Sequence, residues 1–335
     1  AAVIFKSANG SVEYDRYAIN QKEAGETISD YEFDVTAYDD DFMMIIADYA
    51  MNQTDYDVDL QLKDSGMKEP TTLDEGYIYG FNMGATDKVE AAMVKAPLNK
   101  ISDVTTAVNL NGIYAAEYLD GYVMTVNALK ELSIYTPQGT YWSQSKLGNV
   151  DCDIYDMAFN YTDQTLYAIT YHDEKTFLST IDIYNGKLQD IGPFGTGMTT
   201  LGCTTEGQLY GLSRVGELRK IDRQDASSVI VGKVSETKDP QWVSLNYRQS
   251  MAYDHNTGTM YWYAFCYNQT TGKLLSHMST IDLETAETKV MGQFDENCEV
   301  TGLFIPYDGN LDIRPGTQVE SVSLDKTSVA LFPGQ

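Results

Sequence analysis

The sequence contains the same fifteen-residue pattern three times, and this repetition limits the possible fold more than any other feature. Leu178–Gly192 reads LSTIDIYNGKLQDIG, Leu218–Gly232 reads LRKIDRQDASSVIVG, and Met278–Gly292 reads MSTIDLETAETKVMG. All three share Ile-Asp at the same positions and end on Gly, whereas the polar residues between these fixed points differ. A pattern kept only at its apolar and turn positions indicates a structural role, and internal repetition is typical of a repeat architecture.

Each copy follows a second recurring unit, in which a polar turn leads into a short aromatic and β-branched run. The aligned positions of this unit are Tyr79, Val123, Tyr167, Tyr210 and Tyr261, separated by 43 to 51 residues. A third unit, such as MAYDHNTG at Met251–Gly258, precedes the second. Three or four short strands in a repeat of roughly 40–50 residues, with no sustained helical period, are typical of a β-propeller blade.

We therefore expect an all-β fold, a β-propeller of four-stranded blades, whose strands we name a to d from the axis outward. One such blade cannot bury both of its faces alone, so blades pack face to face around an axis. In this arrangement Ile181, Ile221 and Ile281, the isoleucines of the three Ile-Asp pairs, are predicted to be buried between blades.

Counting the repeats predicts seven blades. Five of them span residues 70–104, 112–148, 151–194, 198–234 and 247–294. Residues 31–67 are expected to form another, with Phe42–Ala47 as strand b and Tyr56–Leu62 as strand c. The seventh would join a last strand a at Thr301–Gly309 to N-terminal strands in AAVIFKS and SVEYDRYAIN, because pairing the chain ends removes an open sheet edge. The alternative is six blades, with the first 70 residues forming a single blade.

The C-terminal residues 319–335, VESVSLDKTSVALFPGQ, resemble the opening strands of bacterial immunoglobulin-like domains of group 2. This resemblance predicts a propeller over residues 1–311, a linker over 312–318, and the truncated start of such a domain over 319–335. It also implies a secreted or cell-surface bacterial protein. No signal sequence is present, and the chain begins without Met, so a leader is expected to have been removed. The repeats resemble YVTN or quinoprotein-dehydrogenase-like propellers, which bears on the fold alone.

The charge balance argues against two classes of partner. The chain carries 49 acidic and 23 basic residues, for a net charge of −26. Such a field repels nucleic acid and anionic membrane surfaces, and no apolar run approaches the roughly 18 residues of a membrane helix. We expect no nucleic-acid partner, no membrane insertion and a monomeric chain. The four cysteines, Cys152, Cys203, Cys266 and Cys298, form no CxxC pair, and their disulfide state stays open.

No catalytic or metal motif stands out. The three histidines, His172, His255 and His277, fall in different strand roles, which argues against a shared metal site. Asp55–Asp59 begins like an EF-hand loop but lacks the required Gly and Glu. Acidic residues recur in the a–b turns, where the making of tight turns explains them better than a calcium ring does. These acidic residues are Asp40, Asp74, Asp120, Asp163, Glu206, Asp254 and Asp308. We expect no cofactor and no bound metal.

Aromatic residues on the b–c and d–a loops are the best candidates for a binding site. The longest d–a loop, Ser235–Gln249, carries Trp242, Tyr247 and Arg248. Neighbouring loops add Tyr155, Tyr171, His172 and Tyr267. Exposed Trp and Tyr can stack on sugar rings or anchor a protein, although many of the 25 tyrosines will pack between blades. The sequence thus favours a non-catalytic recognition or adhesion module that binds a glycan or a protein. The alternatives are a propeller hydrolase or lyase with acidic residues near the axis, and an architectural spacer.

Overall fold

The computed structural model describes residues 73–86, 89–138, 141–244, 249–295, 298–311, 313 and 315, together with three strands nearer the N-terminus. By its contacts the chain divides into two compact units, Ala1–Met67 with Val319–Gln335, and Lys68–Gln318. Among the described residues, no helix has the length and apolar character needed to cross a membrane.

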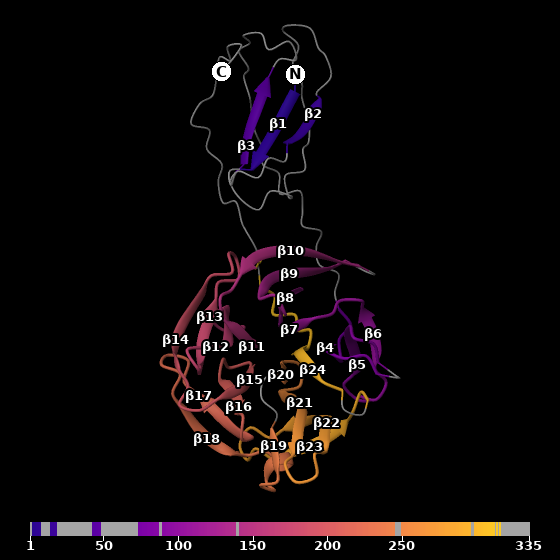
Figure 1. Cartoon of the computed structure of the whole chain (residues 1–335), viewed down its shortest axis with the longest axis vertical. Helices are drawn as coiled ribbons and strands as arrows, with labels where there is room; N and C mark the ends of the chain where they lie inside the picture. Colours follow the sequence, from indigo (N-terminus) through magenta and orange to yellow (C-terminus); the bar gives the residue numbers. More distant parts are fainter. Residues whose placement is uncertain are drawn as a thin grey trace. The chain divides into compact units, whose positions relative to one another are not determined.

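The larger unit is a β-propeller of five four-stranded blades (Figure 1). Blade 1 comprises β7 (Ile113–Leu119), β8 (Tyr122–Asn127), β9 (Glu131–Gln138) and β10 (Tyr141–Asn149). Blade 2 comprises β11 (Asp153–Asn160), β12 (Thr165–His172), β13 (Lys175–Ile181) and β14 (Leu188–Pro193). Blade 3 comprises β15 (Met198–Cys203), β16 (Leu209–Ser213), β17 (Glu217–Ile221) and β18 (Ser228–Lys233).

Blade 4 carries one strand more than the others. It comprises β20 (Ser250–Asp254), β21 (Thr259–Asn268), β22 (Leu274–Ile281) and β23 (Thr288–Gly292). The connection from blade 3 forms a short 3₁₀ helix, η1 (Ser235–Thr237), and then β19 (Trp242–Ser244), which pairs with the far end of β21. The long loop between blades 3 and 4 is therefore partly built into the sheet.

Blade 5 closes the ring with strands from both ends of the propeller. It comprises β24 (Val300–Phe304), β4 (Tyr77–Asn82), β5 (Met93–Pro97) and β6 (Thr105–Val108), with β24 innermost. β24 pairs antiparallel with β4, and Thr301 lies opposite Phe81. The inner strands β7, β11, β15, β20 and β24 contact one another in this order around the axis.

The predicted count of seven blades is wrong, as is the alternative of six. The blade at 70–104 lacks an inner strand of its own, and β24 supplies it, so no further blade is needed. The N-terminal strands β1 (Ala2–Ser7), β2 (Tyr14–Ala18) and β3 (Phe42–Ala47) instead form a separate three-stranded sheet. There β1 pairs directly with β3, with Ile4 opposite Ile45. The all-β class is confirmed. Tyr56–Leu62 and the tail 319–335 lie outside the described residues.

The repeated Ile-Asp pair marks the end of strand c and the start of one kind of turn. The Asp side chain accepts the N–H of the residue two positions on, with N···O distances of 2.8 Å for both Asp182 and Asp222. The Asp carbonyl accepts the N–H four positions on, from Ala226 in blade 3 at 3.0 Å. Ala226 has a φ of 62°, and its counterparts in blades 2 and 4 also have positive φ. The repeat is therefore kept for its turn geometry.

The final Gly of the repeat lets one blade approach the next. A Cβ at Gly192 of blade 2 would lie 2.8 Å from the carbonyl oxygen of Asp225 in the turn of blade 3. A Cβ at Gly232 would lie 2.6 Å from the carbonyl oxygen of Thr285 in the turn of blade 4. Such separations are too short for a real Cβ atom, so these positions require glycine.

The core lies between the blades, as predicted for the repeated isoleucines. Ile181, Ile221 and Ile281 are only 2%, 2% and 5% exposed, and each belongs to a cluster that draws on its own blade and the preceding one. All four cysteines are free and buried, which settles the disulfide question left open by the sequence.

Candidate functional site

The structure brings two of the predicted aromatic residues together at the end of the propeller that carries the b–c turns and d–a connections. The rings of Tyr155 and Tyr171 stack with centroids 5.5 Å apart and planes 14° apart, and both side chains are half-buried. Tyr155 is the extra residue of a β-bulge between Ile154 and Asp156 on β11. Tyr171 lies near the end of β12, opposite Asp153. The bulge redirects Tyr155 beside Tyr171, as bulges next to sites often do.

His172 follows Tyr171 and is held by its own blade. Its ring stacks on Phe177 at 4.1 Å between centroids, and its Nε2 lies 3.0 Å from Asp190 Oδ2. Its Nδ1 lies 3.3 Å from Asp173 Oδ2. Ser179 Oγ in turn donates to Asp190 Oδ1 at 2.7 Å. His172 therefore adds a fixed polar group one residue beyond the tyrosine pair.

The other predicted residues belong to blade 4 or lie outside the described residues. Trp242 on β19 is half-buried, packs against the core of blade 4 and lies opposite Asn268. Tyr267 on β21 is also half-buried and lies opposite Val243. Tyr247 and Arg248 fall in the undescribed stretch 245–248. The described candidates thus lie on blades 2 and 4, and their joint role in one binding site stays a prediction.

The loop that carries Trp242 is anchored by a buried glutamate. Glu236 in η1 accepts from Ser279 Oγ at 2.9 Å and from Thr288 Oγ1 at 2.6 Å, and its Oε1 lies 2.9 Å from His277 Nε2. Burial raises the pKa of Glu236, but the hydrogen bonds from His277, Thr288 and Ser279 outweigh it and leave the pKa below its ordinary value. His277 therefore has a structural role in fixing the d–a loop on blade 4.

Sequence reasoning missed Tyr114, which occupies the place in blade 1 that Tyr155 occupies in blade 2. It is the extra residue of a β-bulge between Ile113 and Ala115 on β7, and it is half-buried. The signal was the dipeptide Ile-Tyr, which begins strand a in both blades. In blade 3 the same bulge position holds Thr199, whose hydroxyl donates to the Leu212 carbonyl at 3.1 Å.

Near the axis, Asp156 joins four blades through hydrogen bonds. Its Oδ2 accepts the N–H of Leu201 at 2.9 Å and of Met251 at 3.1 Å. Its Oδ1 accepts from Ser250 Oγ at 2.7 Å, and the same Oγ accepts the N–H of Leu303 at 2.8 Å. Asp156 is fully buried, and this burial raises its pKa, although the surrounding donors act in the opposite direction. Both carboxyl oxygens accept hydrogen bonds from these donors, so Asp156 links the inner strands of neighbouring blades.

Glu117 lies on β7 and lines a small enclosed cavity on the side of the a–b turns. The lining residues come from all five inner strands or the turns that follow them: Glu117, Phe159, Tyr161, Cys203, Ala252, Tyr253, His255 and Ile305. Glu117 Oε1 accepts the N–H of Tyr118 at 2.7 Å. Removal from bulk water raises the pKa of Glu117 well above its ordinary value, and the charge of Asp156 adds to the rise.

Aromatic rings gather around His255 at this end of the axis. The His255 ring lies 4.8 Å from Tyr161, 5.0 Å from Tyr253 and 4.8 Å from Tyr307, measured between centroids. Its Nδ1 lies 3.2 Å from Thr205 Oγ1. Burial lowers the pKa of His255 to about 4, against the opposing charges of Asp254 and Glu206. Tyr161, Tyr253 and His255 also line the cavity beside Glu117, so this aromatic cluster forms part of the cavity wall.

Two of the acidic residues in the a–b turns bind groups of other segments of the protein. Asp120 accepts the N–H of Gly309 and of Leu311, each at 2.7 Å, and so fixes the segment that leaves the propeller. Asp163 pairs with Arg223 at 2.7 Å. Asp40 lies outside the described residues. Within the described stretches, no group of three or more His, Cys, Asp or Glu side chains is arranged to hold a metal ion.

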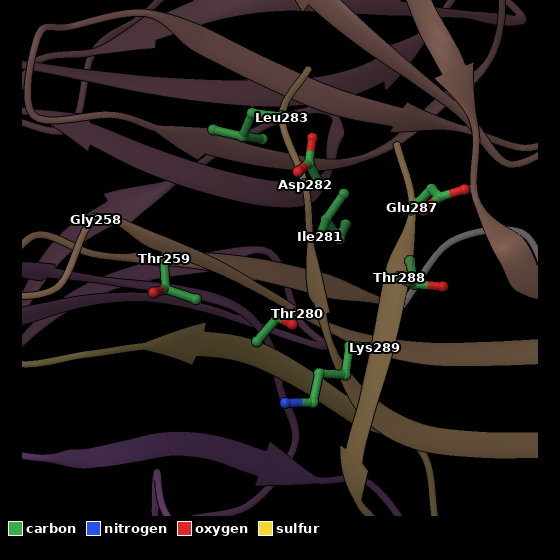
Figure 2. A pocket seen from close by; sticks show the side chains of 9 residues that line it. All are labelled: Gly258, Thr259, Thr280, Ile281, Asp282, Leu283, Glu287, Thr288 and Lys289. Atoms are coloured by element: carbon green, nitrogen blue, oxygen red, sulfur yellow. The ribbon is translucent and has the colours of Figure 1, made fainter. Parts of the chain in front are cut away.

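An open groove lies at the outer side of blade 4 (Figure 2). Its lining comes from the a–b turn, the end of β22 and the start of β23: Gly258, Thr259, Thr280, Ile281, Asp282, Leu283, Glu287, Thr288 and Lys289. Asp282 is already engaged by the turn that follows it, and Thr288 by Glu236. The groove is thus built around the repeated turn of this blade, and two of its polar side chains already have partners within the protein.

Comparison with known proteins finds only distant structural likenesses. No protein-family model and no curated protein matches the chain. TolB from Acinetobacter baumannii has a TM-score of 0.40 at 10% identity, covering 68% of this chain and 66% of its own. A quinonprotein alcohol dehydrogenase-like protein from Bacteroides thetaiotaomicron has a TM-score of 0.37 at 10% identity, with coverages of 68% and 57%.

A protein of unknown function from the same Bacteroides species has a TM-score of 0.37 at 10% identity, covering 53% of this chain and 42% of that one. The chain thus spans between 42% and 66% of the length of these three structures. One of them carries the dehydrogenase-like description that the repeats resemble. Likenesses this low carry no argument about ligand or activity.

Proposed function

We propose that this chain is a non-catalytic recognition module that binds a glycan on the end of the propeller formed by b–c turns and d–a connections. The observation that carries the proposal is the stacked, half-buried pair of Tyr155 and Tyr171. Tyrosine rings offer flat apolar faces and hydroxyl groups, which suit the faces and edges of sugar rings. Because the two rings already support each other, little side-chain freedom is lost on binding.

The chain's charge narrows the ligand class. A net charge of −26 disfavours glycans rich in uronate or sulfate groups, so a neutral glycan is the ligand we propose. A protein ligand is the second candidate. It has less support, because the described tyrosines form a narrow pair and a stable protein interface needs roughly 800 Å² on each partner.

The alternative of a propeller enzyme has one observation in its favour, the raised pKa of Glu117 near Asp156. Perturbed carboxyl groups are typical of catalytic sites. Here, however, Asp156 is saturated by donors from neighbouring blades, and the cavity beside Glu117 is small and enclosed. A substrate would need a wider cleft.

A glycan array tests the proposal, with Tyr155→Ala and Tyr171→Ala as site variants and Tyr184→Ala as the matched control. Tyr184 is a tyrosine of the same blade, but it is exposed and lies in the c–d turn. Loss of a stacking ring should weaken binding by roughly tenfold, whereas the control should bind like the parent. If the parent binds no glycan, or if all three variants bind equally well, the glycan proposal fails.

Export to the cell surface or the medium is part of the same proposal, and it is supported by the resemblance of residues 319–335 to immunoglobulin-like modules. Fractionation of the source bacterium with an antibody against this chain would test it. Recovery in the cytoplasm alone would refute it.

A further inference from the structure

The outer edge of blade 3 is open, although β18 carries a β-bulge at Val231. β18 is the last strand of the sheet order β15-β16-β17-β18, and none of the described strands pairs with its outer side. An edge strand presents unpaired N–H and C=O groups that can pair with another chain, and proteins usually guard such edges with charged side chains.

The register of the repeat shows how blade 3 differs from its neighbours. The first two exposed positions of the outer strand hold Gln189 and Asp190 in blade 2, Lys289 and Val290 in blade 4, and Val229 and Ile230 in blade 3. Val229 is 72% exposed and Ile230 is 51% exposed. Of these three outer strands, only β18 therefore exposes two adjacent aliphatic residues and no charge at these positions.

The charges at the two ends of β18 are opposite. Asp225 is exposed in the turn just before the strand, and Lys233 is exposed at its end. If two copies of β18 run antiparallel along their open edges, the end of each copy that carries Lys233 lies beside the end of the other that carries Asp225. Antiparallel self-pairing thus matches unlike charges, whereas parallel pairing would place like charges together.

The net charge of blade 3 is close to zero, unlike that of the whole chain. Residues 198–234 contain five basic and four acidic side chains, in a protein with a net charge of −26. Two copies can therefore approach through this blade against a weaker field than the whole chain would suggest.

We propose that two copies of this chain associate through antiparallel pairing of their β18 strands about a two-fold axis. Such an interface uses the same patch on both copies and is closed. The area that six-residue strands can bury is small, so we expect a weak dimer, with a Kd on the order of 10–100 μM. The chain would then be monomeric only in dilute solution.

Sedimentation equilibrium of the full chain over a concentration series tests this proposal. The parent should shift from monomer to dimer, and Ile230→Lys should remain a monomer throughout. Val290→Lys is the matched control, because Val290 is 57% exposed at the equivalent position of blade 4. This variant should dimerise like the parent. Both substituted positions are exposed, so thermal midpoints equal to that of the parent would show that folding is unchanged.

Charge gives a second readout. Lys233→Asp should weaken dimerisation several-fold, because two acidic residues would then meet at each end of the pair. Added salt should strengthen dimerisation of the parent by screening the net charge of the two chains. A parent that stays monomeric at about 1 mM, or an Ile230→Lys variant that dimerises as the parent does, would overturn the proposal.

Discussion

Gly192 of blade 2 faces the backbone carbonyl of Asp225 in the turn of blade 3, so closely that a Cβ at residue 192 would lie 2.8 Å from that oxygen. The contact explains why the repeat ends on glycine even though its preceding residues vary. The contact joins the end of one repeat to the turn of the next. The distance between neighbouring blades therefore depends on having no side chain at this position.

Substitution Gly192→Ala should therefore separate two blades. We expect a loss of about 1–3 kcal/mol in the free energy of unfolding, the usual range for overpacking. Gly195→Ala is the control, because a Cβ there meets no atom within 4 Å. It should change stability by less than about 1 kcal/mol. Urea denaturation of both variants measures the difference, and equal stabilities would contradict the close approach.

Asp156→Asn should destabilise the ring by roughly 2–4 kcal/mol. Asn has one amide oxygen in place of two carboxylate oxygens, so it can accept either from the N–H groups of Leu201 and Met251 or from the Ser250 hydroxyl. At least one buried donor therefore loses its partner. A double variant with Ser250→Ala gives the internal check, because Ser250 donates to the same carboxyl group. If both residues belong to one network, the double variant should lose less stability than the sum of the losses of the two single variants.

Glu117→Gln should stabilise the protein at neutral pH by roughly 1–2 kcal/mol. Folding raises the pKa of Glu117, so the fold is favoured at pH values below the carboxyl's unfolded pKa and loses this contribution as the pH rises. The amide cannot ionise, and the variant should lack that loss. Thermal midpoints at pH 4 and pH 7 would show it. A variant that is less stable than the parent at both pH values would argue that the carboxylate itself is needed.

His255 should make the fold sensitive to acid in a defined window. Its pKa is about 4 in the folded state and about 6.5 when unfolded, so the unfolded chain binds more protons between these values. Stability should fall as the pH drops from about 6.5 to about 4, by roughly 2 kcal/mol from this residue after allowing for its partial exposure. His255→Phe should flatten that part of the profile measured by urea denaturation. An unchanged slope would place the acid sensitivity elsewhere.

The repeats were sufficient to predict the propeller and much of its packing. Ile181 and its counterparts are buried between blades because their positions in the pattern leave no other place for them. The blade count failed because AAVIFKS and FMMIIA have the composition of any buried strand. Nothing in their residues distinguishes a propeller blade from the sheet in which Ile4 lies opposite Ile45.

The candidate site could be predicted only in part, for reasons of local geometry. The b–c turns led to Tyr171 and the loop before strand a to Tyr155, and the structure places their rings together, but their role in binding stays a prediction. Tyr114 was missed because a bulge decides its direction, and simple alternation of side chains assigns it to a buried face. The role of Asp156 depends on N–H groups of blades 3 and 4, which are distant in sequence.

The pairing of β24 with β4 also affects the order in which the blades can fold during synthesis on the ribosome. The Cys298 thiol, just before β24, donates a hydrogen bond to Asn82 Oδ1 at the end of β4, and 216 residues of chain separate the two. Blades 1 to 4 can assemble as they emerge, but β4 waits for its inner neighbour until almost the whole propeller has been translated. During that time its edge is open to other nascent chains. A chain that ends before Val300 would keep that edge open permanently, so we expect such truncations to aggregate.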